Sequence, residues 1–392
     1  MTDVFILSAV RTPIGKFGGS LAAFTAADMG AVAAKAAIER AAISPEQVQE
    51  TIFGNGRQAG GGPNVARQIS IRSGVPETVP AYTVNMACAS GMKSLALGFE
   101  EIANGNLECV LAGGTESMSR LPYYLEARWG IRMGHQELVD GMYRDGFFCP
   151  LAKMLMGETA EGLAGQYRIT REEQDEYALC TQKRAERAIR SGRMKDEIAP
   201  VTIESKKGTQ LFEQDEHPFF GATMEKMAKL PPVFSKTGTV TAGNSSGITD
   251  GAAAMVLANE TFVKQNQLKP LSRIMGATSA GVNPQTMGIG PVPALRKIKD
   301  KLGLGVSDFD LVELNEAFAA QVLACDRELH FDRERLNVNG GAIALGHPIG
   351  CTGTRITVTL LHEMLKRNAK RGIATLCVSG GMGMALALEN VA

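Results

Sequence analysis

The chain has 392 residues, of which 44% are hydrophobic and 21% are charged, and its 41 basic residues balance its 41 acidic ones. This length and composition suit a globular protein with a large core and two or three domain-sized units. The zero net charge gives no general electrostatic reason to expect nucleic acid or a membrane surface as a partner.

Seven scattered cysteines without a CxxC pair argue against a disulfide framework and against a zinc site. The opening residues lack the basic segment and long apolar run of a signal peptide, and no apolar run reaches transmembrane length. We therefore expect a cytoplasmic protein that holds no metal.

The first third of the chain alternates apolar, strand-like segments with segments of helical periodicity. Such alternation predicts an α/β layered fold. Strands are predicted at 4–10, 48–53, 81–84 and 108–114, the last closed by a glycine pair, and helices at 26–42 and 92–103.

The same order of elements returns about 260 residues later. Residues 297–314 resemble residues 37–53, because both contain a helix, a turn with a serine and a short apolar strand. The same offset carries Cys88 to the neighbourhood of His347, again in a glycine-rich loop before a helix, which is predicted at 354–365. We infer two copies of one α/β unit.

The first copy is interrupted by a long insertion. After Gly114 about 130 residues precede the comparable apolar strand at 252–257, whereas the second copy runs directly into its last strand. The predicted parts are an N-terminal half (1–116 plus 248–268), an inserted loop domain (117–247) and a C-terminal half (269–392).

Cys88 lies where the third predicted strand turns into a helix. Free backbone N–H groups and the positive end of the helix dipole gather at such a place, and both favour a thiolate over a thiol. A lone cysteine in an apolar stretch is more often a small buried hydrophobe. Position alone therefore leaves both interpretations of Cys88 open.

Three loops of the second copy lie where strands end, which is where α/β folds place their sites. His347 could supply the base that a thiol needs, or could be an ordinary turn histidine. Cys377 could be a core residue that ends a buried strand, or could face a cleft beside two glycines. Asn315 could cap the next helix, or could hold a water or a carbonyl oxygen.

Several motifs together resemble those of the thiolases. They are NMACASGMKSL, NEAFA, GGAIALGHPIGCTG and CVSGGMG, with TAGNSSGITDGAAA at 241–254, and the likeness extends to the opening SAVRTPIGKFGG. The resemblance implies a thiolase-like fold, with two duplicated βαβαβαββ halves in a layered α-β-α-β-α arrangement and an inserted loop domain. It also implies an acyltransferase that acts on CoA thioesters, needs no cofactor and forms a homodimer or homotetramer.

The resemblance also implies roles for the residues of the site. Cys88 would carry the acyl group, His347 would activate it, and Cys377 would take or return the α-proton of the acetyl group. One oxyanion hole would be formed by His347 with a water held by Asn315, and another by the N–H groups of Cys88 and Ser379. Further substrate contacts would come from Ser246, which would lie against the pantetheine arm, and from Met156, Phe318 and Met287.

Three positions depart from the thiolase pattern. Ser379 stands where many thiolases have glycine, but it still supplies an N–H group. Leu155 stands where short-chain biosynthetic members often have histidine, and Phe219 and Phe220 stand where most members have an arginine near the nucleotide end of CoA. The last two departures leave open which acyl chain length is preferred and how the CoA phosphates are bound.

The sequence thus predicts an acetyl-CoA C-acetyltransferase, which condenses two acetyl-CoA to acetoacetyl-CoA and catalyses the reverse thiolysis. Leu155 and the two phenylalanines keep a degradative 3-ketoacyl-CoA thiolase of fatty-acid β-oxidation as an alternative. A ketoacyl-synthase-like condensing enzyme would use no second reactive cysteine, so Cys377 argues against it. The presence of all four catalytic candidates argues against an acyl-CoA-binding relative without activity.

Overall fold

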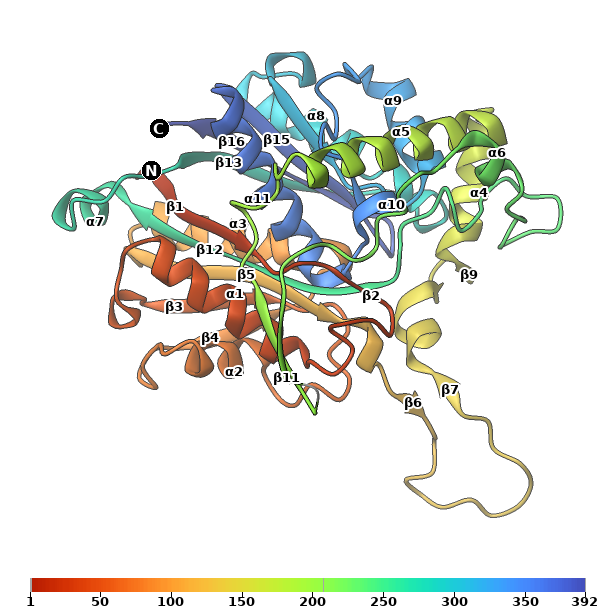
Figure 1. Ribbon diagram of the computed structural model, residues 1–392, viewed down its shortest axis with the longest axis horizontal. Coiled ribbons are helices and arrows are strands. Elements are labelled where there is room, and N and C mark those ends of the chain that lie inside the picture. Colours follow the sequence, from red (N-terminus) through yellow and green to blue (C-terminus); the bar gives the residue numbers. More distant parts are fainter. Residues whose placement is uncertain (1, 207, 392) are drawn as a thin grey trace.

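The computed structural model describes residues 2–206 and 208–391, and a mixed β-sheet runs through it (Figure 1). The strand order is β14-β15-β16-β13-β1-β12-β5-β3-β4, and β2 pairs with β12. The strands are β1 (Val4–Arg11), β2 (Gly15–Lys16), β3 (Glu50–Gly54), β4 (Ala81–Val84), β5 (Cys109–Ser117), β12 (Thr249–Asn259), β13 (Ser272–Gly281), β14 (Leu311–Leu314), β15 (Arg371–Val378) and β16 (Met382–Asn390).

The sheet has two similar halves that meet where β1 pairs with β13. In the first half β3 is parallel to β4 and β5, and in the second β14 is parallel to β15. Antiparallel strands complete each half. The helices of the two halves are α1 (Ala26–Arg40), α2 (Val65–Arg72), α3 (Ser90–Ala103), α7 (Glu260–Gln265), α8 (Pro291–Leu302), α9 (Ala319–Leu329), α10 (Ala342–Leu345) and α11 (Ile349–Arg367).

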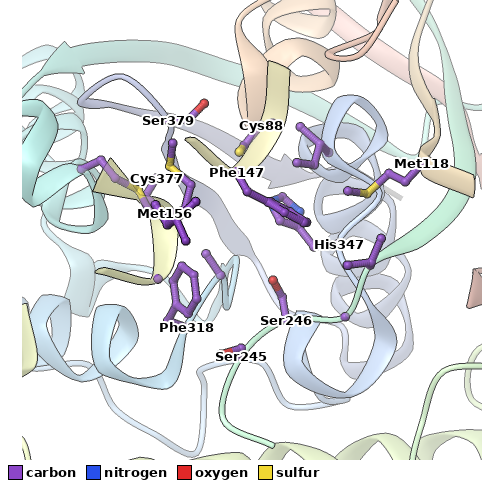
Figure 2. Close-up of a pocket in the computed structure, with 18 of the residues that line it drawn as sticks. Cys88, Met118, Phe147, Met156, Ser245, Ser246, Phe318, His347, Cys377 and Ser379 are labelled. Atoms are coloured by element: carbon purple, nitrogen blue, oxygen red, sulfur yellow. The ribbon is translucent and has the colours of Figure 1, made fainter. Parts of the chain in front are cut away.

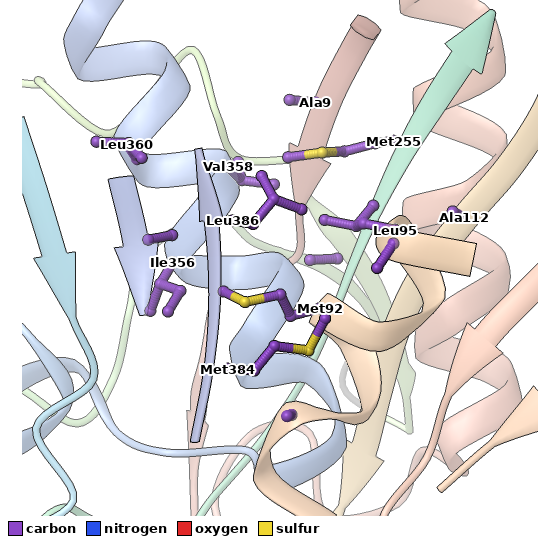
Figure 3. Packing of buried hydrophobic residues seen from close by; sticks show 14 of the residues in the cluster. Ala9, Met92, Leu95, Ala112, Met255, Ile356, Val358, Leu360, Met384 and Leu386 are labelled. Carbon is purple, nitrogen blue, oxygen red and sulfur yellow. The ribbon is translucent and has the colours of Figure 1, made fainter. Parts of the chain in front are cut away.

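Helices α3 and α11 form the middle layer, between the two halves of the sheet. Figure 3 shows Met92 and Leu95 of α3 among side chains of α11 and of both sheet halves, and all belong to one buried cluster. Helices α1 and α2 cover the outer face of the first half, and α8 and α9 cover that of the second. The layers are therefore α-β-α-β-α, as the resemblance to thiolases implies. Burial on both faces explains the almost continuous apolar runs of β5 and β12.

The two middle helices cross closely near their first turns. A side chain at Gly91 of α3 would come within 2.6 Å of Oγ1 of Thr354 in α11, so a glycine is needed there. This close approach brings together the two loops that precede the helices. One loop contains Cys88 and the other contains His347.

Strands β5 and β12 pair directly, from Ser117 with Asp250 to Cys109 with Ala258, although about 130 residues separate them in the chain. The inserted segment begins after β5 and ends before β12. The exact division into two halves and a loop domain stays a prediction. Its elements are β6 (Tyr123–Tyr124), β7 (Val139–Asp140), β8 (Phe148–Cys149), β9 (Met154–Leu155), α4 (Met156–Gln166), α5 (Arg171–Arg190), β10 (Val201–Ser205), β11 (Gly208–Phe212) and α6 (Met224–Ala228).

The segment between β6 and β7 projects away from the body of the molecule (Figure 1). Two of its large apolar side chains are almost fully exposed, Trp129 at 93% and Met133 at 90%. Among the helices of the described part of the chain, none combines the length and apolar character needed to cross a bilayer.

Candidate active site

A cavity of about 250 Å³ lies where the loops of the two halves meet the inserted segment (Figure 2). Most of the candidate residues from the sequence contribute to its wall. They are Cys88, Met156, Ser246, Met287, Phe318, His347, Cys377 and Ser379. Asn315 is the one candidate that does not line it.

Cys88 lies in a short 3-10 turn, Ala87–Ala89, between β4 and α3. Ala87 has a φ of 45°, and the hydroxyl of Ser90 fixes the turn by donating to its carbonyl oxygen at 2.6 Å. The predicted preference for the thiolate is outweighed by burial, which raises the pKa of the Cys88 thiol. The charge of Arg57 and the backbone N–H groups of Ser379 and Cys88 act in the opposite direction.

His347 lies directly before α11, which begins at Ile349 rather than at the predicted Thr354. Pro348 is the N-cap residue, and its carbonyl oxygen accepts from the N–H groups of Cys351 and Thr352, both at 2.9 Å, so the helix extends back to Ile349. Nδ1 of His347 lies 2.6 Å from Oγ1 of Thr352, and this hydroxyl donates its hydrogen to the carbonyl oxygen of Pro348 at 3.0 Å. These two bonds assign the proton of the ring to Nδ1 and leave the lone pair of Nε2 free.

Burial lowers the pKa of His347 to about 3, and the charges of Arg355 and Arg57 act in the same direction. The imidazole is therefore neutral at physiological pH. A neutral imidazole with a free Nε2 can accept a proton from a thiol.

Cys377 lies in β15, and Ser379 follows at the turn to β16. Burial raises the pKa of Cys377 well above its ordinary value, and the neighbouring Cys88 adds to the effect. The backbone N–H group of Ser379 lowers the pKa of Cys88 against the effect of burial, and both residues line the cavity. The ends of β15 and the Cys88 turn therefore meet at one place, although they come from different halves.

Asn315 is buried and directly follows β14. Its backbone N–H donates to the carbonyl oxygen of Thr375 at 3.0 Å. It does not cap α9, because Phe318 occupies the N-cap position. Neither polar atom of its amide has a hydrogen-bond partner among the described residues.

Apolar and aromatic side chains make up most of the remaining wall. The rings of Phe318 and Phe234 meet edge to face with their centroids 6.2 Å apart. Ser246 lies on the opposite side from Cys88 (Figure 2), and its N–H donates to the carbonyl oxygen of Ala317 at 3.0 Å. Leu155 also lines the cavity.

Two family models match the chain in succession, "Thiolase, N-terminal domain" over residues 4–261 and "Thiolase, C-terminal domain" over residues 268–390. The chain belongs to the thiolase family. It is 50% identical to an acetyl-CoA acetyltransferase of Cupriavidus necator and 51% identical to one of Escherichia coli, each with all of both chains covered.

Solved thiolase structures share the fold of this chain. The crystal structure of the Bacillus anthracis acetyl-CoA acetyltransferase superposes with a TM-score of 0.98 at 47% identity, covering 100% of this chain and 99% of that one. Human mitochondrial 3-ketoacyl-CoA thiolase superposes with a TM-score of 0.97 at 44% identity, with the same coverage. The thiolase-like fold predicted from the sequence is confirmed.

Phe219 and Phe220, where this thiolase departs from the family pattern, lie outside the wall of the cavity. Both rings carry a cation on one face. Nζ of Lys226 lies 5.1 Å from the centroid of Phe219, and the guanidinium carbon of Arg190 lies 5.2 Å from that of Phe220. These are cation–π contacts at the surface of the inserted segment.

Sequence reasoning missed two charged residues of this site, Glu116 and Arg57. Glu116 is the second-last residue of β5 and accepts four hydrogen bonds: from Nδ2 of Asn55 at 2.6 Å and from the N–H groups of Gly56 at 3.0 Å, Arg57 at 3.1 Å and Gly350 at 2.8 Å. The carboxylate thus joins the loop after β3 to the first turn of α11. The available signal was a carboxylate near the end of a strand whose first six residues carry no charge or hydrogen-bonding side chain other than a thiol.

Arg57 stands in the loop that Glu116 holds, and its side chain reaches the wall of the cavity. The sequence signal was a charged residue directly after the glycines that end a strand at the catalytic edge of the sheet. Among the described residues there is no cluster of three or more His, Cys, Asp or Glu side chains that could hold a metal ion.

Proposed function

We propose that this thiolase is an acetyl-CoA C-acetyltransferase that works by ping-pong chemistry through an acyl group on Cys88. The observation that carries the proposal is the meeting of Cys88, His347 and Cys377 in one largely apolar cavity. The full-length relatives named acetyl-CoA acetyltransferase support the choice of substrate.

In the first half of the reaction, Cys88 would attack the carbonyl carbon of acetyl-CoA. His347 would take the proton of the thiol on Nε2, since its Nδ1 is bound to Thr352. The thioester bond to CoA would break, and CoA would leave with the proton from His347. The product is an acetyl group on Cys88 as a new thioester.

In the second half, Cys377 would first pass its thiol proton to His347 and would then, as a thiolate, remove an α-proton from a second acetyl-CoA. The carbon of the resulting enolate would attack the acetyl carbonyl on Cys88, and acetoacetyl-CoA would leave as the Cys88 sulfur takes the proton held by His347. Two cysteines in one site can divide nucleophile and base duties because their surroundings differ. Cys377 lies deeper than Cys88, at 1% against 8% exposed.

Both steps place negative charge on an oxygen, so each needs hydrogen-bond donors that are already in place. The N–H groups of Cys88 and Ser379 would serve one oxygen. A water bound to Asn315 would serve the other together with His347. The two unpartnered polar atoms of the Asn315 amide support this role, since a buried amide without a protein partner is suited to binding water.

A degradative 3-ketoacyl-CoA thiolase is the second candidate. Leu155 favours it, because its apolar side chain in the cavity wall suits a longer acyl chain. The deciding experiment is a thiolysis series with free CoA, from acetoacetyl-CoA to 3-ketohexadecanoyl-CoA. Cleavage of acetoacetyl-CoA alone supports the acetyltransferase, and faster cleavage of longer chains supports the degradative enzyme. No cleavage of any substrate would refute both.

The substrates of this proposal are CoA thioesters alone, with no metal or redox cofactor. We further propose a homodimer or homotetramer in the cytoplasm. The exposed apolar side chains of the projecting 125–138 segment support self-association, because a surface of this kind is stabilised when a partner covers it.

A further inference from the structure

Arg57 brings a positive charge into the wall of the catalytic cavity. Among the described residues that line the cavity, it is the single lysine or arginine. Its side chain is buried, with 8% of the residue exposed, and much of the surrounding wall is apolar, as at Met118, Phe147 and Ile349. A cation in such surroundings is costly unless an anion or several hydrogen bonds compensate for its lost hydration.

The protein compensates for this charge only in part. Nη2 of Arg57 donates to the carbonyl oxygen of Gly146 at 3.2 Å, and Nη1 donates to that of Gly56 at 3.4 Å. Nε has no acceptor among the described residues, and no described carboxylate lies within 4.0 Å of the guanidinium. Glu116 instead binds the backbone N–H of Arg57, so it fixes the loop without forming a close ion pair with the side chain.

The Glu116 carboxylate attracts the charge of Arg57 without contacting the guanidinium. The cavity can supply a second anion, because the sulfur of Cys88 is negative when it attacks. Three other titratable groups lie close to Cys88. His347 is neutral, Cys377 is held as the uncharged thiol, and the Glu116 carboxylate opposes a negative charge on Cys88. Arg57 is the strongest influence that lowers the pKa of Cys88 against the effect of burial.

We propose that Arg57 stabilises the thiolate of Cys88 and thereby raises the fraction of enzyme ready for the first attack. The inference rests on the proposed role of Cys88 as nucleophile. Arg57 acts through Cys88, so it is a positioning residue rather than a catalytic one. The two carbonyl bonds hold its guanidinium in place, and the free Nε leaves part of its charge available to the cavity.

The test is the pH dependence of alkylation of Cys88 by iodoacetamide, followed by mass spectrometry of the Cys88 peptide. In Arg57→Met the apparent pKa of Cys88 should rise by about one pH unit, because the charge is lost while an unbranched side chain remains. Arg57→Lys should stay nearer to wild type. Arg72→Met is the matched control, since Arg72 pairs with Asp28, is half-exposed on α2 and does not line the cavity, and it should leave the pKa of Cys88 unchanged.

Two results would overturn the inference. One is an unchanged pKa of Cys88 in an Arg57→Met protein whose urea unfolding shows that it is folded. The other is an equal rise in the methionine and lysine variants, which would show that charge is not the cause.

Alkylation requires no turnover of acyl-CoA, so this test is independent of the proposed function. If Cys88→Ser retained full thiolysis activity, the proposed function would fail, while the effect of Arg57 on the thiol could still be measured.

Discussion

Replacing Glu116 with glutamine should weaken the joint between the two loops of the active site while leaving the shape of the side chain almost unchanged. Oε2 of Glu116 accepts from Gly56 and Gly350, and Oε1 accepts from Asn55 and Arg57. In glutamine an NH₂ group replaces one of these two oxygens. At either position it would be a donor that faces other N–H donors. The less costly orientation keeps the oxygen toward Gly56 and Gly350.

In that orientation the amide of Asn55 can turn over, because its Oδ1 has no present partner among the described residues and can accept from the new NH₂. The N–H of Arg57 is then left without an acceptor, and Asn55 loses its bond to the carbonyl oxygen of Thr115. A buried donor left unpaired costs about 1–3 kcal/mol. We expect Glu116→Gln to lower the free energy of unfolding by that amount.

The kinetic effect should exceed what the lost stability explains. The loop after β3 contacts the Cys88 turn through Asn85, which donates to the carbonyl oxygen of Gly56 at 3.2 Å and accepts from the N–H of Ala87 at 2.9 Å. Gly350 lies three residues after His347. A small shift between these loops should lower kcat for acetoacetyl-CoA thiolysis roughly tenfold, with a smaller change in KM.

Asp310→Asn is the matched control. Oδ2 of Asp310 also accepts two backbone N–H groups, from Lys370 at 2.8 Å and Arg371 at 2.9 Å, but at the opposite end of β14 from the site. Its kcat should equal that of wild type. The reasoning about Glu116 is refuted if Glu116→Gln unfolds at the wild-type urea concentration and retains wild-type kcat.

Two further predictions concern stability and assembly. The pKa of His347 is about 3 in the folded chain and near 6.5 when the chain is unfolded. Between these pH values the unfolded state binds one more proton than the folded state. The free energy of unfolding should therefore fall as the pH drops from 6.5 toward 3. His347→Asn should show a shallower fall in urea titrations, and equal slopes would contradict the burial of a neutral imidazole. Trp129→Ser combined with Met133→Ser should weaken self-association in light scattering without changing kcat per chain, and an unchanged oligomer would exclude the projecting segment from the interface.

The order of elements in both halves could be predicted because buried strands and amphipathic helices have different periodicities. The repeat further indicated that Cys88 and His347 occupy equivalent loops, and the structure places both in the wall of one cavity. The predicted start of α11 was five residues too late. The glycines and the proline around His347 resemble a loop, although Pro348 is compatible with a helix start.

The electrostatics of the site could not be predicted from the sequence. A cysteine before a helix suggested a favoured thiolate, but burial dominates, and how deeply Cys88 lies depends on residues far away in the chain. For the same reason the local signals of Glu116 and Arg57, a carboxylate near a strand end and an arginine after a glycine turn, did not reveal what these residues contact. Their importance comes from contacts with Gly350, Gly146 and the cavity, which only the fold brings together.

The central claim is that Cys88 carries the acyl group, and the most direct measurement is peptide mass spectrometry after brief incubation with acetyl-CoA and acid quenching. The account predicts one added acetyl group, located on the peptide that contains Cys88, which disappears when free CoA is added and does not form in Cys88→Ser. Acetylation of Cys377 instead, or wild-type acetoacetyl-CoA thiolysis by Cys88→Ser, would contradict it.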